Sequence, residues 1–223
     1  MAALLASPRA QGDWGVAYAP ADKSGPRPAI VFLHGMWASP EDSCEPFASA
    51  ATPFGFLVCP RANAPMGAAG PGYMMWQGGY AEAARSIHAA LDAADALAPG
   101  KRSDRGGTLI GFSNGAYFAA EVACSEPGRW TGLVLMSMKL DLDAKRLARA
   151  GVTRVLLAAG ERDESRTSMQ SLVDRLNQDH GTLPFEARFM SLGDVGHTFP
   201  SDMETRMCAA ISWVRGTMCT ISL

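Results

Sequence analysis

Gly111-Phe112-Ser113-Asn114-Gly115 directly follows the apolar run Thr108-Leu109-Ile110 and opens an alanine-rich stretch with helical spacing. This order predicts a strand, a tight turn at the serine and then a helix. The two glycines suit such a turn because side chains two positions before or after the serine would collide with the neighbouring strand and helix. The arrangement is that of a nucleophile elbow. The same pattern also arises by chance in glycine-rich loops, so the sequence must supply partners for the serine.

Two suitable partners follow other apolar runs that predict strands. Asp163 comes after the run 155–159, and His197 comes after the run 188–192. A serine hydroxyl is a weak nucleophile at neutral pH and needs a base, and imidazole has the pKa to accept and return its proton. The candidates occur in the order Ser113, Asp163, His197, which is the α/β-hydrolase order and differs from those of chymotrypsin-type and subtilisin-type proteases.

The acid has four competitors, namely Glu161, Asp194, Asp141 and Asp143. Asp163 is favoured because the loop after residues 156–160 is expected to end at the sheet edge, beside the loop of His197. His34 is another histidine near an expected strand end, and it precedes Gly35, the glycine that lets the chain bend. We expect His34 to hold that loop through side-chain hydrogen bonds.

Length and composition fit one domain with a single sizeable core over residues 1–223. The chain has 48% hydrophobic and 19% charged residues, which is ordinary for a globular protein. A net charge of -2 without a basic cluster argues against a nucleic-acid partner. The most basic stretch, 101–105, contains Asp104 and is predicted to be a solvated loop.

No apolar run approaches the roughly 20 residues that span a bilayer, so a membrane span is not expected. Residues 2–6 are too short for a signal-peptide core and lack a basic leader. The compartment stays open between the cytoplasm and export after removal of a leader.

Apolar runs alternate with helical patterns, which predicts an α/β fold with a mostly parallel central sheet and helices on both faces. Residues 1–25 form an N-terminal edge segment, with an antiparallel edge strand at 14–18. Helices are expected within 39–52 and over 80–98, and the Ser201-Asp202-Met203-Glu204 pattern predicts a capping box for the last helix.

Two connections concern the site. Only about 15 residues separate the strand ending near Met138 from the one starting near Arg154, which leaves no room for a large cap domain. The segment 61–79 is rich in Gly, Pro, Ala and Met and leaves the sheet at its carboxyl edge. Because ligands bind at that edge in open α/β sheets, this segment is the predicted active-site loop.

The five cysteines are an odd number, so at least one thiol is unpaired within a monomer. No C-x-x-C spacing is present, and neither a zinc site nor a thioredoxin-like site is expected. Cys44 and Cys59 fall at the same edge of the expected sheet, where either a disulfide or two buried thiols would fit. Cys208 and Cys219 are a second candidate pair, at the C-terminal tail.

The chain resembles the α/β-hydrolase superfamily, and among its compact members the carboxylesterase/phospholipase and predicted-esterase group. It is also similar to dienelactone hydrolases and to polyester depolymerase or feruloyl esterase domains. Four segments carry the resemblance: Leu33-His34-Gly35, Cys59-Pro60-Arg61-Ala62, Met75-Trp76-Gln77 and Gly196-His197.

The resemblance implies roles for five residues. Ser113 would be the nucleophile, His197 the general base and acid, and Asp163 the residue that orients the imidazole. The backbone N–H groups of Met36 and Asn114 would form the oxyanion hole.

Further side chains are candidates for the acyl pocket or for simple packing: Trp37, Met74, Met75, Trp76 and Phe199. The expected activity is hydrolysis of small-molecule carboxylic esters with short to medium acyl chains, through an acyl-enzyme, without a metal or organic cofactor. A thioesterase or peptidase with the same residues, or an idle binding protein, is the alternative. The oligomeric state is not predicted.

Overall fold

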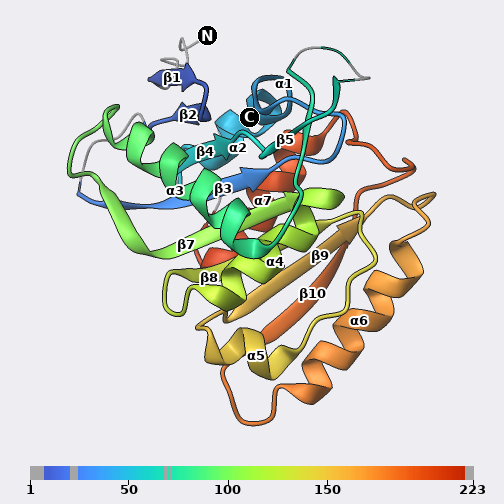
Figure 1. Ribbon diagram of the computed structural model, residues 1–223. Helices are drawn as coiled ribbons and strands as arrows, with labels where there is room; N and C mark the ends of the chain where they lie inside the picture. The colour runs from blue at the N-terminus through green and yellow to red at the C-terminus, as the bar shows by residue number, and fades with distance from the viewer. Residues whose placement is uncertain (1–7, 21–24, 68–69, 71, 219–223) are drawn as a thin grey trace, which may run out of the picture.

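The computed structural model describes residues 8–20, 25–67, 70 and 72–218. Within these residues an eight-stranded sheet has the order β1-β2-β4-β3-β7-β8-β9-β10 (Figure 1). The strands are β1 (Arg9–Gly12), β2 (Gly15–Tyr18), β3 (Arg27–Leu33), β4 (Phe56–Pro60), β7 (Arg102–Phe112), β8 (Trp130–Met136), β9 (Arg154–Ala159) and β10 (Glu186–Ser191). The pairs β1–β2 and β2–β4 are antiparallel, and all other pairs are parallel. A separate pair joins β5 (Ala64–Pro65) to β6 (Met74–Met75).

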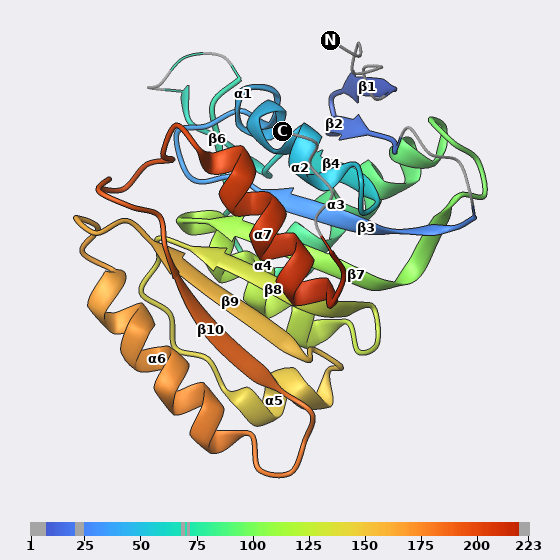
Figure 2. The same ribbon diagram turned by 180° about the vertical axis from the view of Figure 1, so that it is seen from behind.

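Helices cover both faces of the sheet. One face carries α3 (Tyr80–Asp95), α4 (Asn114–Ser125), α5 (Ala144–Arg149) and α6 (Arg166–Asp179), which lie toward the viewer in Figure 1. The other carries α1 (Pro40–Cys44), the 3-10 helix η1 (Glu45–Phe47), α2 (Ala48–Ala51) and α7 (Met203–Arg215), which lie toward the viewer in Figure 2. This arrangement confirms the predicted α/β fold class.

Each face of the sheet packs its own hydrophobic core. Leu109 belongs to the core under α3 and α4, whereas the next residue, Ile110, belongs to the core under α7. Successive side chains of a strand point to opposite faces, so a central strand covered on both sides is apolar at every position. The continuous apolar runs of the sequence therefore mark the central strands.

Two expectations for the strands were wrong. The strand predicted at the sheet edge is β2, and it lies between β1 and β4, because β1 forms the edge. The stretch 101–105 was predicted to be a loop, but β7 already begins at Arg102. The Arg102 side chain is only 7% exposed and forms ion pairs with Asp95 and Asp104, which removes the cost of placing its charge there.

Helix boundaries also differ from the expectations. The segment 39–52 divides into α1, η1 and α2, and α3 ends at Asp95 instead of continuing to residue 98. The predicted capping box is wrong, since α7 starts at Met203 and its N-cap, Asp202, makes no side-chain capping bond. The Asp202 carboxylate instead accepts a hydrogen bond from Arg206 at 2.8 Å.

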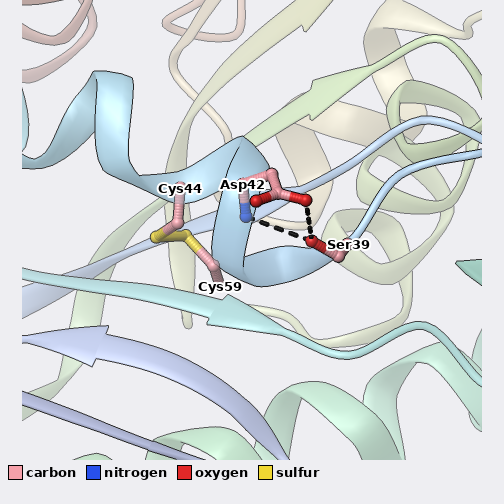
Figure 3. The surroundings of a disulfide bond; sticks show 4 residues. All are labelled: Ser39, Asp42, Cys44 and Cys59. Carbon is pink, nitrogen blue, oxygen red and sulfur yellow. Dashed lines mark hydrogen bonds between the residues drawn. A yellow bond between two sulfur atoms is a disulfide. The ribbon is translucent and has the colours of Figure 1, made fainter. Parts of the chain in front are cut away.

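A disulfide joins Cys44 of α1 to Cys59 of β4, with a Cα–Cα distance of 6.0 Å (Figure 3). The structure thus has the bridge instead of two buried thiols. Beside it, Ser39 caps α1, because its hydroxyl accepts from the Asp42 backbone N–H at 3.1 Å and donates to the Asp42 carboxylate at 2.8 Å. Cys208 is also disulfide-bonded, its expected partner Cys219 lies outside the described residues, and Cys124 is the free thiol of the described part.

Candidate active site

Ser113 occupies the turn between β7 and α4 in a strained backbone conformation. Its φ is 52° and its ψ is -123°, a region that costs of order 1–3 kcal/mol for a residue with a side chain. Its N–H donates to the Met136 carbonyl at 2.8 Å, which holds the turn against β8. A Cβ on Gly111 would lie 2.5 Å from the Gly115 carbonyl oxygen, and a Cβ on Gly115 would lie 2.1 Å from that of Leu33. Both glycines are therefore required by close backbone approach.

His197 lies between Ser113 and Asp163 and makes a hydrogen bond to each. Its Nε2 is 2.9 Å from Ser113 Oγ, and its Nδ1 is 3.0 Å from Asp163 Oδ2. The carboxylate can only accept, so Nδ1 carries the proton and Nε2 of the neutral ring is left to accept from the serine hydroxyl. The side chain of His197 is 51% exposed, while that of Asp163 is fully buried.

Asp163 is held by the residue two positions further along. Its Oδ1 accepts from the Ser165 backbone N–H at 2.8 Å and from the Ser165 hydroxyl at 2.7 Å, which leaves Oδ2 for His197. Burial alone raises the pKa of Asp163, but the two hydrogen bonds from Ser165, followed by the Ser137 hydroxyl and the charge that His197 carries when it is protonated, outweigh it, and the net pKa is lowered. The carboxylate is therefore ionised and fixed in orientation.

The four competing carboxylates have hydrogen-bond or ion-pair partners other than His197. Asp143 caps α5 by accepting two backbone N–H groups of its first turn, and Asp194 pairs with Arg162 at 2.9 Å. Asp141 pairs with a side chain of α6, and Glu161 accepts from a side chain of β10. In the described residues, Asp163 is the carboxylate that has a hydrogen bond to His197.

The loop after β3 passes directly beside the serine. A Cβ on Gly35 would lie 3.3 Å from Ser113 Cβ, so this glycine allows the close approach. Met36 and Trp37 follow with 44% and 54% of their surface exposed, and Trp37 has a φ of 60°. A positive φ is a true outlier for a bulky residue, and such strain concentrates at functional sites.

His34 anchors the start of this loop. It is 1% exposed, and its Nδ1 lies 2.8 Å from the Gly35 carbonyl oxygen. Burial is the main cause that lowers the pKa of His34 to about 4, so the ring is neutral near pH 7 and Nδ1 donates to the carbonyl. Its Nε2 has no hydrogen-bond partner among the described residues.

The other candidate pocket residues differ in position. Trp76 is only 1% exposed and lies in the core, so it offers no surface to a substrate, contrary to the expectation that it lines a pocket. Phe199 is half-buried and packs on Phe112, with ring centroids 4.6 Å apart. Met74 and Met75 are half-buried in β6, and the Met74 N–H donates to a carbonyl of the loop after β3 at 3.1 Å.

No family model matches the chain, and no curated protein matches it by sequence. Solved structures match its fold across nearly the whole chain. Esterase PE8 has a TM-score of 0.64 at 22% identity, covering 94% of this chain and 98% of that one. The Bacillus cereus carboxylesterase has a TM-score of 0.62 at 19% identity, covering 90% and 92%. An S-formylglutathione hydrolase from Agrobacterium tumefaciens has a TM-score of 0.60 at 13% identity, covering 94% of each chain.

The chain has the α/β-hydrolase fold. This fold places Ser113, Asp163 and His197 on three loops, which follow β7, β9 and β10 at the carboxyl ends of parallel strands. In the described chain, the connection between β8 and β9 holds only the short helix α5, where an α/β-hydrolase with a cap would carry a longer insertion. Within the described ranges, no large cap covers the site.

Cavities of appreciable size also lie outside this group of three residues. One of 310 Å³ is lined by Ser39, Glu41, Asp42, Arg61, Gly72 and Tyr73. Another of 540 Å³ lies at the opposite, amino edge of the sheet, between the starts of β9 and β10 and the end of α7. Among the described residues, no group of three or more His, Cys, Asp or Glu side chains is placed to hold a metal ion. Within the same ranges, no helix is long and apolar enough to cross a membrane.

The role of Ser165 was not predicted from the sequence. The spacing Asp163-Glu164-Ser165 is the signal that could have revealed it, because an aspartate readily accepts the backbone N–H two residues further on. The hydrogen bonds of Trp76 were missed as well, and they join residues far apart in the sequence.

Proposed function

We propose that the chain is a serine hydrolase that cleaves carboxylic esters of short to medium acyl chains through an acyl-enzyme. The observation that carries this proposal is the continuous hydrogen-bonded line from Ser113 through His197 to Asp163, with the serine in a strained turn at a strand end. Strain of this kind, beside a histidine in the tautomer needed for a base, is costly to maintain without a function.

The proposed reaction begins when Ser113 Oγ attacks the ester carbonyl carbon and His197 Nε2 takes the hydroxyl proton. The negative charge that develops on the carbonyl oxygen is stabilised by the backbone N–H groups of Met36 and Asn114. The imidazolium then gives its proton to the leaving alcohol, and the acyl group stays on Ser113. Water repeats the attack with the same base, which releases the acid and restores the serine. Asp163 keeps the imidazole oriented and stabilises its charged form.

The preference for short to medium acyl chains is supported by the surroundings of the serine. His197 is half-exposed, none of the elements that the structure describes forms a large cap over the site, and Met36 and Trp37 present apolar surface next to the serine. The half-buried Met74 and Met75 of β6 extend this apolar surface. Similarity to proteins named as an esterase and a carboxylesterase agrees with an ester substrate.

A thioesterase or a peptidase would use the same residues, and a similar fold occurs in an S-formylglutathione hydrolase. An idle binding protein is the remaining alternative. The chemistry of acyl transfer is shared among the three enzymes, so substrate competition has to distinguish them.

The test measures covalent labelling by a fluorophosphonate and hydrolysis of p-nitrophenyl esters from acetate to dodecanoate. Ser113→Ala should abolish labelling, and Ser113→Ala and His197→Ala should each lower kcat by about 10⁶-fold, because these groups act as a unit. Asp163→Asn should lower it by about 10⁴-fold, while the matched Asp141→Asn should leave it unchanged. Near-normal turnover by Ser113→Ala would refute the proposal, and turnover of thioesters or anilides above that of esters would assign the alternative.

A further inference from the structure

The two N–H donors of the proposed oxyanion hole lie on separate segments. Met36 follows β3, and Asn114 begins α4. Donors must lie about 2.7–3.1 Å from the developing oxyanion, so the relative position of the two segments has to be fixed. Trp76, which comes from the segment 61–79, makes a hydrogen bond to each of them.

The two contacts of Trp76 are short and use different groups. Its backbone N–H donates to Asn114 Oδ1 at 2.8 Å, and its indole Nε1–H donates to the His34 carbonyl oxygen at 3.0 Å. The first contact holds the residue that carries one proposed donor. The second contact holds the His34 carbonyl, two residues before Met36. The Met36 backbone carries the other proposed donor.

Burial makes this connection rigid. The indole lies in the core cluster formed with α3 and α4. Its ring centroid is 5.8 Å from that of His34 and 6.3 Å from that of Phe118. Water does not compete for a buried indole N–H, and a broken bond there would leave the donor unsatisfied. The hydrogen bond to His34 is therefore maintained together with the packing of the ring.

We propose that Trp76 is a positioning residue that fixes the separation of the two oxyanion-hole donors. The inference rests on the proposed serine-hydrolase function. Because the oxyanion forms only after the serine attacks, misplaced donors stabilise the transition state less and leave substrate binding nearly unchanged. Loss of the indole bond should therefore lower kcat without a matching change in KM.

The test compares Trp76→Phe with Trp130→Phe, a matched control. Trp130 is likewise 1% exposed in the same core cluster, and its Nε1–H donates to Glu126 at 2.7 Å, away from the serine. Each substitution removes one indole hydrogen bond, which is buried at Trp76 and partly buried at Trp130, and both should lower Tm. Only Trp76→Phe should lower kcat, by about 10-fold, because a full oxyanion donor is worth about 10²–10³.

A second variant keeps the test decisive if Trp76→Phe does not fold. Asn114→Ala keeps the backbone N–H of residue 114 but removes the acceptor for the Trp76 N–H, and it should also lower kcat by about 10-fold. Active sites are counted by fluorophosphonate titration, so that a loss of correctly folded protein is not mistaken for slower turnover.

Inhibition by an aryl trifluoromethyl ketone separates positioning from a general structural defect. The serine oxygen adds to the ketone carbon, the hydroxyl proton passes to His197, and the ketone oxygen becomes an oxyanion in the hole. We expect the inhibition constant to rise by the same factor by which kcat/KM falls, whereas a smaller folded fraction would leave that constant unchanged. If both Trp76→Phe and Asn114→Ala keep the wild-type kcat and the wild-type inhibition constant while Ser113 is still labelled, the positioning role of Trp76 is overturned and the proposed function is not. Absence of labelling in the wild-type protein would overturn it together with the proposed function.

Discussion

Acidification should destabilise the protein through His34, the buried histidine at the start of the loop beside Ser113. The ring is 1% exposed, and burial is the main cause that lowers the pKa of His34 from 6.5 to about 4. The folded protein therefore keeps this imidazole neutral over a range of pH in which the unfolded chain protonates it.

The sign and size of the effect follow from proton linkage. Between pH 6.5 and pH 4 the unfolded state binds more protons at His34, so the free energy of unfolding falls as the pH falls. A pKa difference of this size corresponds to a limit of about 3 kcal/mol. From pH 7 to pH 5 the loss is about 2 kcal/mol, which is a large fraction of the stability of an ordinary domain.

The assay is urea unfolding of the wild-type protein and His34→Asn at pH 7, 6 and 5. The variant lacks the titrating ring, so its deficit relative to wild type should shrink by about 2 kcal/mol between pH 7 and pH 5. Val31→Ala serves as the control, because it removes buried side-chain atoms from β3, the strand that precedes His34, and contains no titrating group. A deficit of His34→Asn that stays constant over this range, as that of Val31→Ala should, would refute the reasoning.

Three other predictions concern backbone space, the disulfide and access to the site. Gly115→Ala should lower the free energy of unfolding by about 3 kcal/mol in urea unfolding, because its Cβ would lie 2.1 Å from a carbonyl oxygen of β3. Gly67→Ala, which meets no atom within 4 Å, should change it little, and equal effects would contradict the steric argument. Replacing Cys44 and Cys59 by Ala should cost about 3 kcal/mol in the same assay, as expected for a link between residues 15 apart, and an unchanged midpoint would contradict this. Ester hydrolysis should follow the dissolved substrate concentration without a jump at its solubility limit, since no large cap covers the serine in the part of the chain that the structure describes, and such a jump would contradict an open site.

The central strands could be predicted from the sequence because both of their faces are buried. Residues 29–33 form the end of β3, and each of their side chains packs in one of the two cores. A run without polar interruptions is therefore a direct consequence of the layers of the fold. The predicted alternation of helices and strands is confirmed for the central part of the sheet, while the predicted helix ends differ from the structure by a few residues.

Elements without a continuous apolar run were missed. β1 is half-exposed and polar, and it depends on its antiparallel pairing with β2. The first part of β7 pairs with β3, with Arg102 opposite Arg27, and the Arg102 guanidinium is neutralised by Asp95. Local sequence carries no sign of the pairing of β7 with β3, because Arg27, the partner of Arg102 in the sheet, lies 75 residues earlier (102 − 27 = 75).

The residues proposed to carry out the reaction could be predicted from the sequence, whereas the residue proposed to position the oxyanion-hole donors could not. Parallel strands bring their carboxyl ends to one edge, so the order of Ser113, Asp163 and His197 along the chain predicted that they meet, with four other carboxylates left as competitors for the acid. The structure places the three side chains within hydrogen-bond distance. Trp76 contacts residues 38 and 42 positions away in the chain, and the path of the segment 61–79 decides both contacts. The proposed roles of this segment are to seat the substrate and to hold the donors, and a segment with both roles cannot vary freely. Substitutions that change substrate preference should therefore be tolerated at its exposed positions and not at Trp76.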